Sequence, residues 1–154
     1  MYIELSEQKK ILADVANGLS HCHQQGVYHR NLSPSSVYLT PQGRAMVGDF
    51  DFARVPTVSR TLSAQSKSLI VGRHVAPEQL MLLPNVDQRA DVFSLGVVWY
   101  DMVFRPAKDK VVEREKIATA SLPDYDKEVM QMLLAVSPPE RIQSMQEVRQ
   151  YLYS

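Results

Sequence analysis

The residues from Asp91 to Val103 place the strongest constraint on how this chain can fold. Their sequence, DVFSLGVVWYDMV, is apolar on nearly every side of a helix. A helix with no polar face is stable only where other elements cover it all round. The run carries Asp101 and is far too short to cross a bilayer. The sequence therefore predicts a domain built around one central, buried helix.

Amphipathic segments on both sides of this run can supply the cover. The first is a helix predicted from Ser6 to about Gln25, with Ser6 as its N-cap and Gly26 as a left-handed stop. Its apolar face repeats at three- and four-residue steps through Leu12, Val15, Leu19 and Cys22. This pattern predicts an amphipathic core helix.

The remaining segments predict shorter elements. Two short apolar runs, Val37 to Leu39 and Ala45 to Val47, flank a turn and indicate a β-hairpin. Phe104 to Ala120 is read as loop with one short helix. A helix from Asp124 to Val136 should turn four residues inward: Val129, Met132, Leu133 and Val136. Ser144 and Glu147 form a capping box that opens a last helix to about Tyr151. We expect a mainly α fold with a small hairpin, and one domain over residues 1–154.

Composition limits the classes of function. The chain has 17 Lys plus Arg and 17 Asp plus Glu, so its net charge is zero and it offers no broad field to nucleic acid or an anionic membrane. Its N-terminus has no apolar signal core, and the single cysteine, Cys22, cannot form an internal disulfide. We expect a cytoplasmic protein with no nucleic-acid or membrane partner.

Four short motifs occur in a fixed order along the chain. They are His29-Arg30-Asn31-Leu32-Ser33-Pro34-Ser35-Ser36, Asp49-Phe50-Asp51, Ala76-Pro77-Glu78 and Asp91-Val92-Phe93-Ser94-Leu95-Gly96. In that order they resemble H-R-D-L-x-x-x-N, D-F-G, A-P-E and D-x-W-S-x-G of eukaryotic-type protein kinases, whose members include Ser/Thr kinases. The resemblance covers only the larger, helical C-terminal lobe (C-lobe). In the family a small β-rich N-terminal lobe (N-lobe) with the glycine-rich loop, strand lysine and helix glutamate precedes it. The resemblance thus implies a C-lobe without an N-lobe, and a fragment of a longer multidomain protein.

Several catalytic positions of the family hold different residues here. The position of the general base holds Asn31, whose neutral amide cannot accept a proton near pH 7. Ser33 stands for the phosphate-contacting lysine, and Ser36 for the asparagine that binds the second metal. By resemblance Asp49 is the retained metal ligand. Asp51 replaces the glycine of D-F-G and adds a carboxylate nearby.

Other positions keep their architectural residues. The resemblance implies a buried ion pair between Glu78 and Arg141. It also implies that Asp91 holds the backbone at His29 and Arg30, that His29 stacks on Phe50, and that Tyr38 and Val98 lie near the floor of an adenine pocket. The segment before Ala76 departs from the family, because Val71 in Ile70-Val71 replaces its threonine.

Two local patterns have competing interpretations. His21, Cys22 and His23 are neighbours that point to different faces of a helix, so packing is favoured over a zinc site. Arg30 could meet a phosphate on one of the hydroxyl residues Ser59, Thr61, Ser63, Ser66 and Ser68. The other interpretation of that stretch is a solvated loop.

These features predict a pseudokinase-type lobe, catalytically inactive and working through protein contact. The face that an N-lobe would cover, near Leu12, Tyr38 and Phe50, should be apolar and should meet a protein partner or the parent's own N-lobe. No cofactor is expected, and Mg-ATP only if that N-lobe is present. The alternatives are residual Ser/Thr phosphotransfer, with Asp49 and Asp51 holding metal, and nucleotide sensing without transfer.

Overall fold

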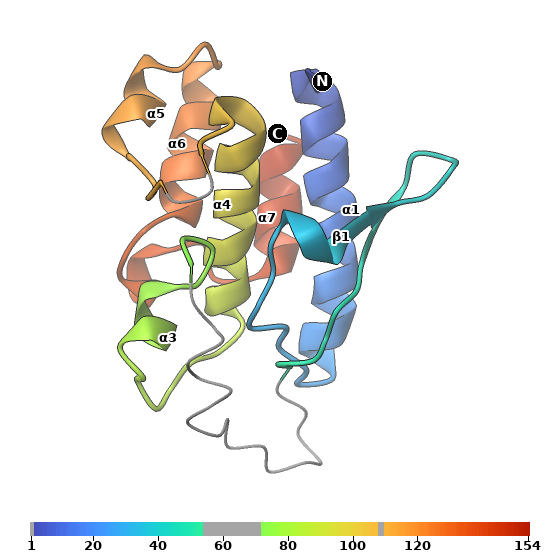
Figure 1. Cartoon of the computed structure of the whole chain (residues 1–154), viewed down its shortest axis with the longest axis vertical. Helices are drawn as coiled ribbons and strands as arrows, with labels where there is room; N and C mark the ends of the chain where they lie inside the picture. The colour runs from blue at the N-terminus through green and yellow to red at the C-terminus, as the bar shows by residue number, and fades with distance from the viewer. Residues whose placement is uncertain (1, 54–71, 108–109) are drawn as a thin grey trace.

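The computed structural model describes residues 2–53, 72–107 and 110–154 (Figure 1). The elements in chain order are α1 (Leu5–Gln24), η1 (Pro34–Ser36), β1 (Val37–Leu39), β2 (Ala45–Val47), α3 (Pro77–Leu80), α4 (Arg89–Phe104), α5 (Glu115–Thr119), α6 (Asp124–Leu133), η2 (Pro138–Glu140) and α7 (Met145–Leu152). The strands form one two-stranded antiparallel sheet. The prediction of a mainly α fold with a small hairpin is confirmed. Over the described ranges, no helix combines the length and apolarity needed to cross a membrane.

Helix α4 lies at the centre of the fold, between α1 and α6 (Figure 1). Every residue from Ala90 to Tyr100 is buried, and Trp99 is fully so. Gly96 faces α6 so closely that a Cβ there would lie 2.8 Å from the Cβ of Leu133. The buried central helix predicted from the apolar run is confirmed, and its glycine marks the close approach of two helices.

Helix α1 packs against α4, α7 and β2 along its buried face. It begins at Leu5, with Glu4 at the N-cap and no side-chain cap, so the prediction that Ser6 caps it is wrong. The start lies earlier because Gln8 bonds to the incoming chain: its backbone N–H donates to the Glu4 carbonyl at 2.9 Å and its Nε2 to the Ile3 carbonyl at 2.8 Å. Gly26 has φ of 71°, the left-handed conformation expected at the stop.

Helix α6 is shorter than predicted. It ends at Leu133, and Val136 is 58% exposed, so the inward position expected of Val136 is wrong. The cause is Arg141, whose guanidinium donates to the carbonyls of Ala135 and Val136 at 3.0 and 3.2 Å. Because those carbonyls bond to Arg141, the chain leaves the helix. Val129 and Leu133 are buried as predicted.

The last helix, α7, is capped by Ser144, whose hydroxyl accepts from the Glu147 backbone N–H at 3.1 Å. The Glu147 carboxylate reaches back to the backbone N–H of Gln143 at 3.1 Å, one residue earlier than in a standard capping box. Helix α5 is the short helix expected between Phe104 and Ala120.

The hairpin is confirmed with the register Val37↔Val47, Tyr38↔Met46 and Leu39↔Ala45. It is tied to α1 by the Ala45 backbone N–H, which donates to Asp14 Oδ2 at 3.0 Å. Because Val37 pairs with Val47, residues 29–36 and 48–53 both adjoin the open end of the hairpin, beside the C-terminal part of α1 (Figure 1).

Candidate functional site

Asp91, fully buried at the start of α4, organises the 29–31 backbone. Its Oδ2 accepts from the backbone N–H of His29 and its Oδ1 from that of Arg30, both at 2.9 Å. Arg30 adopts φ of 66°, a conformation that costs a non-glycine residue energy and persists only where its surroundings hold it. One buried carboxylate thus fixes the strained start of the motif.

His23 is a further partner of Asp91 that sequence reasoning missed. Its Nε2 lies 2.7 Å from Asp91 Oδ2, and its side chain is only 9% exposed. The available signal was the acid itself, because a carboxylate inside an apolar helix must find donors from a neighbouring element. His21, by contrast, is exposed, and the described part of the chain holds no cluster of three or more His, Cys, Asp or Glu suited to a metal.

His29 joins the two halves of the site. Its ring centroid lies 4.6 Å from that of Phe50 in a tilted contact, and its Nε2 lies 2.7 Å from the Gly48 carbonyl oxygen. The structure thus brings His29 and Phe50 together as the resemblance implied.

The polar residues of the 31–36 segment bond within their own loop. The Asn31 backbone N–H donates to His29 Nδ1 at 3.2 Å. The buried Ser36 hydroxyl donates to the Ser33 carbonyl at 2.9 Å and accepts from the Ser33 backbone N–H at 3.0 Å. The Ser33 and Ser35 hydroxyls lie 2.7 Å apart. These neutral groups stabilise a turn and supply neither a base nor a cation.

Asp49 also has φ in the left-handed region, at 58°. Its Oδ2 accepts a 2.7 Å hydrogen bond from the hydroxyl of Tyr38. This hydrogen bond raises the pKa of Tyr38, with smaller contributions from desolvation and the Asp49 charge. Tyr38 is 51% exposed on the hairpin, whereas Val98 is 4% exposed inside the core around α4. Asp51 is exposed.

Glu78 and Arg141 form a buried, two-pronged ion pair. The Arg141 guanidinium donates to Glu78 Oε1 at 2.7 Å and Oε2 at 3.1 Å, and to the Arg89 carbonyl at 2.6 Å. It also lies over the ring of Phe93, 5.1 Å from the centroid. Glu78 and Arg141 are 5% and 2% exposed. The pair ties α3 to α4 and to the segment after α6.

A second ionic cluster, which the sequence did not reveal, holds residues 73–74 on α4. Arg73 Nε donates to Asp101 Oδ1 at 3.0 Å, and His74 Nε2 lies 2.5 Å from Asp101 Oδ2. Burial alone would raise the pKa of Asp101, but the hydrogen bonds from His74 and Arg73 outweigh it and lower that pKa. A few residues further on, Gln79 in α3 donates to the Arg30 carbonyl at 2.9 Å, so α3 contacts the 29–31 backbone.

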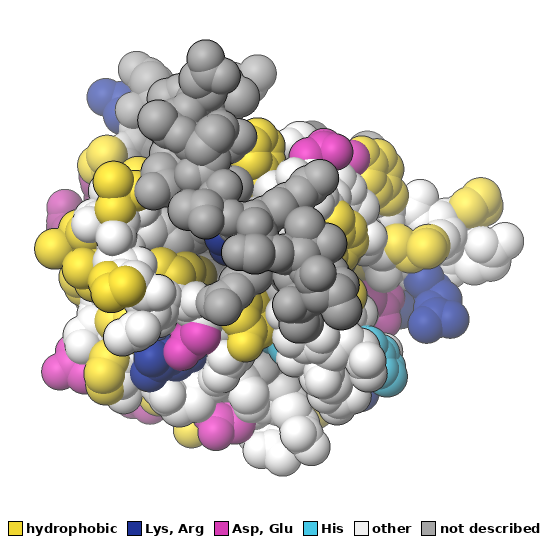
Figure 2. All heavy atoms as spheres, turned by 90° about the horizontal axis from the view of Figure 1, so that it is seen from below, with side chains coloured by type: hydrophobic (Ala, Val, Ile, Leu, Met, Phe, Trp, Pro, Cys, Tyr) yellow, Lys and Arg dark blue, Asp and Glu magenta, His cyan; other side chains and the backbone are white. Residues whose placement is uncertain are grey.

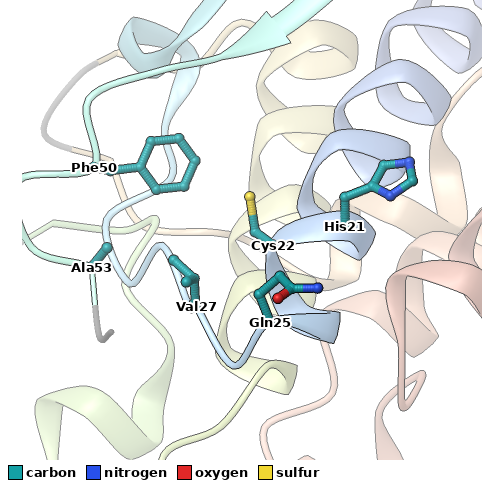
Figure 3. A pocket seen from close by; sticks show the side chains of 6 residues that line it. All are labelled: His21, Cys22, Gln25, Val27, Phe50 and Ala53. Atoms are coloured by element: carbon teal, nitrogen blue, oxygen red, sulfur yellow. The ribbon is translucent and has the colours of Figure 1, made fainter. Parts of the chain in front are cut away.

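An open, largely apolar pocket of about 450 Å³ lies between the end of α1 and the segment that carries Phe50 (Figure 3). Phe50 and Cys22 point toward it from opposite sides (Figure 3). Burial, and next the charge of Asp91, raises the pKa of the Cys22 thiol. The pocket is lined by His21, Cys22, Gln25, Val27, Phe50 and Ala53.

Exposed apolar side chains gather in two further places. On the hairpin Tyr38, Leu39 and Met46 are each more than half exposed, which fits the expected apolar face, but Leu12 is 1% exposed and belongs to the core. Leu12 is buried because its side of α1 faces α4 and α7, so its assignment to that face is wrong. The second group lies around α3, where hydrophobic side chains cover the left part of the face seen from below (Figure 2). The side chains from Leu80 to Leu83 are 47–70% exposed.

Two predictions lie outside the described residues. These are the replacement at Ile70-Val71 and the candidate phosphate acceptors Ser59, Thr61, Ser63, Ser66 and Ser68.

Comparison with known proteins agrees with this geometry. Residues 1–153 match the family described as the protein kinase domain. The chain belongs to the protein kinase domain family, and its mainly helical structure with one two-stranded sheet is consistent with the C-lobe of a kinase.

Individual relatives are Ser/Thr and Tyr kinases. The chain is 31% identical over 96 residues to the probable serine/threonine-protein kinase PknB of Bifidobacterium longum, covering 62% of this chain and 14% of that protein. It is 36% identical over 110 residues to the tyrosine-protein kinase MasK of Myxococcus xanthus, covering 65% and 16%. Over 142 residues it is 26% identical to the eukaryotic translation initiation factor 2-alpha kinase 1 of Plasmodium falciparum, covering 86% and 9%. The chain therefore spans less than a fifth of each of these relatives.

Proposed function

We propose that this chain is a catalytically inactive, pseudokinase-type C-lobe that acts as an interaction or regulatory module. The observation that carries the proposal is Asn31 at the position of the general base, in a site whose other polar residues bond to one another. Loss of a positioned base typically lowers the rate of proton transfer chemistry by about 10²–10⁴-fold.

The remaining catalytic positions support the same function. The hydroxyls of Ser33 and Ser36 make hydrogen bonds within the 31–36 turn. Asp49 Oδ2 accepts a hydrogen bond from the Tyr38 hydroxyl. A single carboxylate without phosphates or a second ligand is a weak Mg²⁺ site. The module works without a cofactor, and Mg-ATP would require an N-lobe.

The proposed partner surface comprises the hairpin side chains Tyr38, Leu39 and Met46 and the pocket beside Phe50. Exposed apolar groups gathered at one edge favour a protein partner, or an N-lobe of the same protein, over water. With zero net charge, the chain has no broad field that would favour nucleic acid or a membrane.

A second function draws support from the retained Asp49 and from the ordered scaffold around Asp91. In that function the lobe transfers phosphate weakly, or senses nucleotide, once an N-lobe is in place. The two proposals differ in whether Mg-ATP binds through Asp49.

The discriminating experiment is the melting temperature of the chain with and without Mg-ATP, repeated on the longer protein if the gene encodes residues ahead of it. A non-catalytic module predicts no shift of the chain alone, and no shift of the longer protein that depends on Asp49. The matched variant is Asp49→Asn. A shift that this variant abolishes would favour the sensing or transfer function, with a size set by nucleotide concentration over Kd.

A further inference from the structure

Tyr38 occupies the space beside Asp49. Besides its 2.7 Å hydrogen bond to Asp49, its ring lies against Gly48, where an added Cβ would come within 2.9 Å of the ring atom Cε2. Only a glycine at position 48 therefore lets the ring lie where it does. Two independent features, the absent side chain at Gly48 and the acceptor at Asp49, fit the same tyrosine.

The backbone of Gly48, on which the Tyr38 ring lies, is fixed by residues of the 29–36 segment. The Gly48 backbone N–H donates to the Ser36 carbonyl at 2.9 Å, and the Gly48 carbonyl lies 2.7 Å from His29 Nε2. On the other side, the strand register places Tyr38 opposite Met46. The position of Tyr38 thus follows from the pairing of β1 with β2 and from the contacts that order residues 29–36.

We propose that Tyr38 is an internal cap on Asp49, which competes with a divalent cation for the carboxylate and so sets the low cation affinity of this site. A cation that binds Asp49 Oδ2, or bridges both carboxylate oxygens, has to displace the phenol from that oxygen, and the phenol then loses its hydrogen bond. The inference deepens the proposed function, on which it rests: the site has lost its base and is also capped from within.

The test uses Mn²⁺ alone, a paramagnetic cation that prefers oxygen ligands. It measures the broadening of the backbone amide signals of residues 48–50 by NMR at one subsaturating concentration. We expect Tyr38→Phe, which keeps the ring and removes the donor, to increase Mn²⁺ binding at these amides on the order of threefold, the value of a modest hydrogen bond. Adding Asp49→Asn to Tyr38→Phe should abolish the increase.

Tyr125→Phe is the matched control, since Tyr125 is also exposed and its hydroxyl donates to the Tyr151 carbonyl at 3.1 Å, away from this site. It should bind Mn²⁺ as the wild type does. If Tyr38→Phe perturbs the hairpin signals, Tyr38→Leu tests the same point with a smaller apolar side chain.

Equal broadening in the wild type and both Tyr38 variants would overturn the inference. So would an increase that survives Asp49→Asn, because the cation would then bind elsewhere. Neither result bears on Mg-ATP binding or phosphotransfer, so the proposed function is tested separately by the Asp49-dependent thermal shift and by phosphate transfer.

Discussion

The polar groups in the buried centre of this lobe and those at its exposed edge differ in how far along the chain their hydrogen-bond partners lie. Around α4, Asp91 and Arg141 are buried charges that satisfy groups from segments far away in the chain. At the edge, Ser33, Ser36 and Asp49 bond mostly to near neighbours, within a turn or across one hairpin. Removing a long-range buried tie should strongly destabilise the lobe, whereas changing an edge residue should leave its stability nearly unchanged. This difference explains how a kinase lobe can keep its architecture while its catalytic positions change.

The largest effect should come from the ion pair at the centre. Arg141→Ala leaves Glu78 buried and unpaired and removes donors from three carbonyls, so the free energy of unfolding should fall by about 3–5 kcal/mol. Urea denaturation measures the change. Lys127→Ala is the control, because its ion pair with Asp124 is at the surface and should contribute about 0–1 kcal/mol. Equal losses in the two variants would contradict the distinction between centre and edge.

The second prediction concerns the contact between α4 and α6. Gly96→Ala would place a Cβ 2.8 Å from the Leu133 Cβ and 3.1 Å from Leu134 Cδ2. Overpacking of this kind typically costs about 1–3 kcal/mol, even though alanine is the better helix former. Thermal or urea unfolding would show it, and an unchanged or raised stability would mean that α4 and α6 are not packed this closely.

Gly18, on the exposed side of α1, is the counterpart of Gly96. An added Cβ meets nothing within 4 Å, so Gly18→Ala should raise the free energy of unfolding by about 0.5–1 kcal/mol through helix propensity alone. The same denaturation experiment applies. A loss of stability would show that this face of α1 is covered.

The smallest effect should be the pH dependence of the Asp101 cluster, which lies between the buried centre and the surface. Because the folded-state pKa of Asp101 is lowered, its contribution to stability is present above the unfolded pKa of about 3.9 and is lost as pH falls through the folded value. Asp101→Asn should therefore be less stable than the wild type at pH 7, and the difference should shrink below about pH 4. A constant difference from pH 7 to pH 3 would contradict the ionic role of Asp101.

The sequence predicted the central elements better than the polar ties. The apolar run from Asp91 to Val103 could only be a buried helix, and the hairpin followed from two short apolar runs around a turn. The predicted start of α1 and end of α6 were wrong because side chains of Gln8 and Arg141 bond to backbone carbonyls just beyond these helix ends. No helical or strand periodicity encodes such bonds.

The contacts of the candidate site also fall into two groups, those that the sequence motifs predicted and those that they did not. The Glu78–Arg141 contact and the backbone hydrogen bonds that Asp91 accepts were expected from the motifs. The contacts of His23 with Asp91, of His74 with Asp101 and of Tyr38 with Asp49 were not, because each joins residues whose proximity only the folded chain reveals.

The central claim, that this lobe keeps the scaffold of a kinase without its chemistry, is tested most directly by phosphate transfer. The measurement follows labelled γ-phosphate of Mg-ATP into a protein substrate, using the wild type and Asp49→Asn in the longest protein that the gene encodes. The account predicts that both give the same background incorporation. Transfer by the wild type that Asp49→Asn abolishes would contradict it and would make this an active kinase despite Asn31.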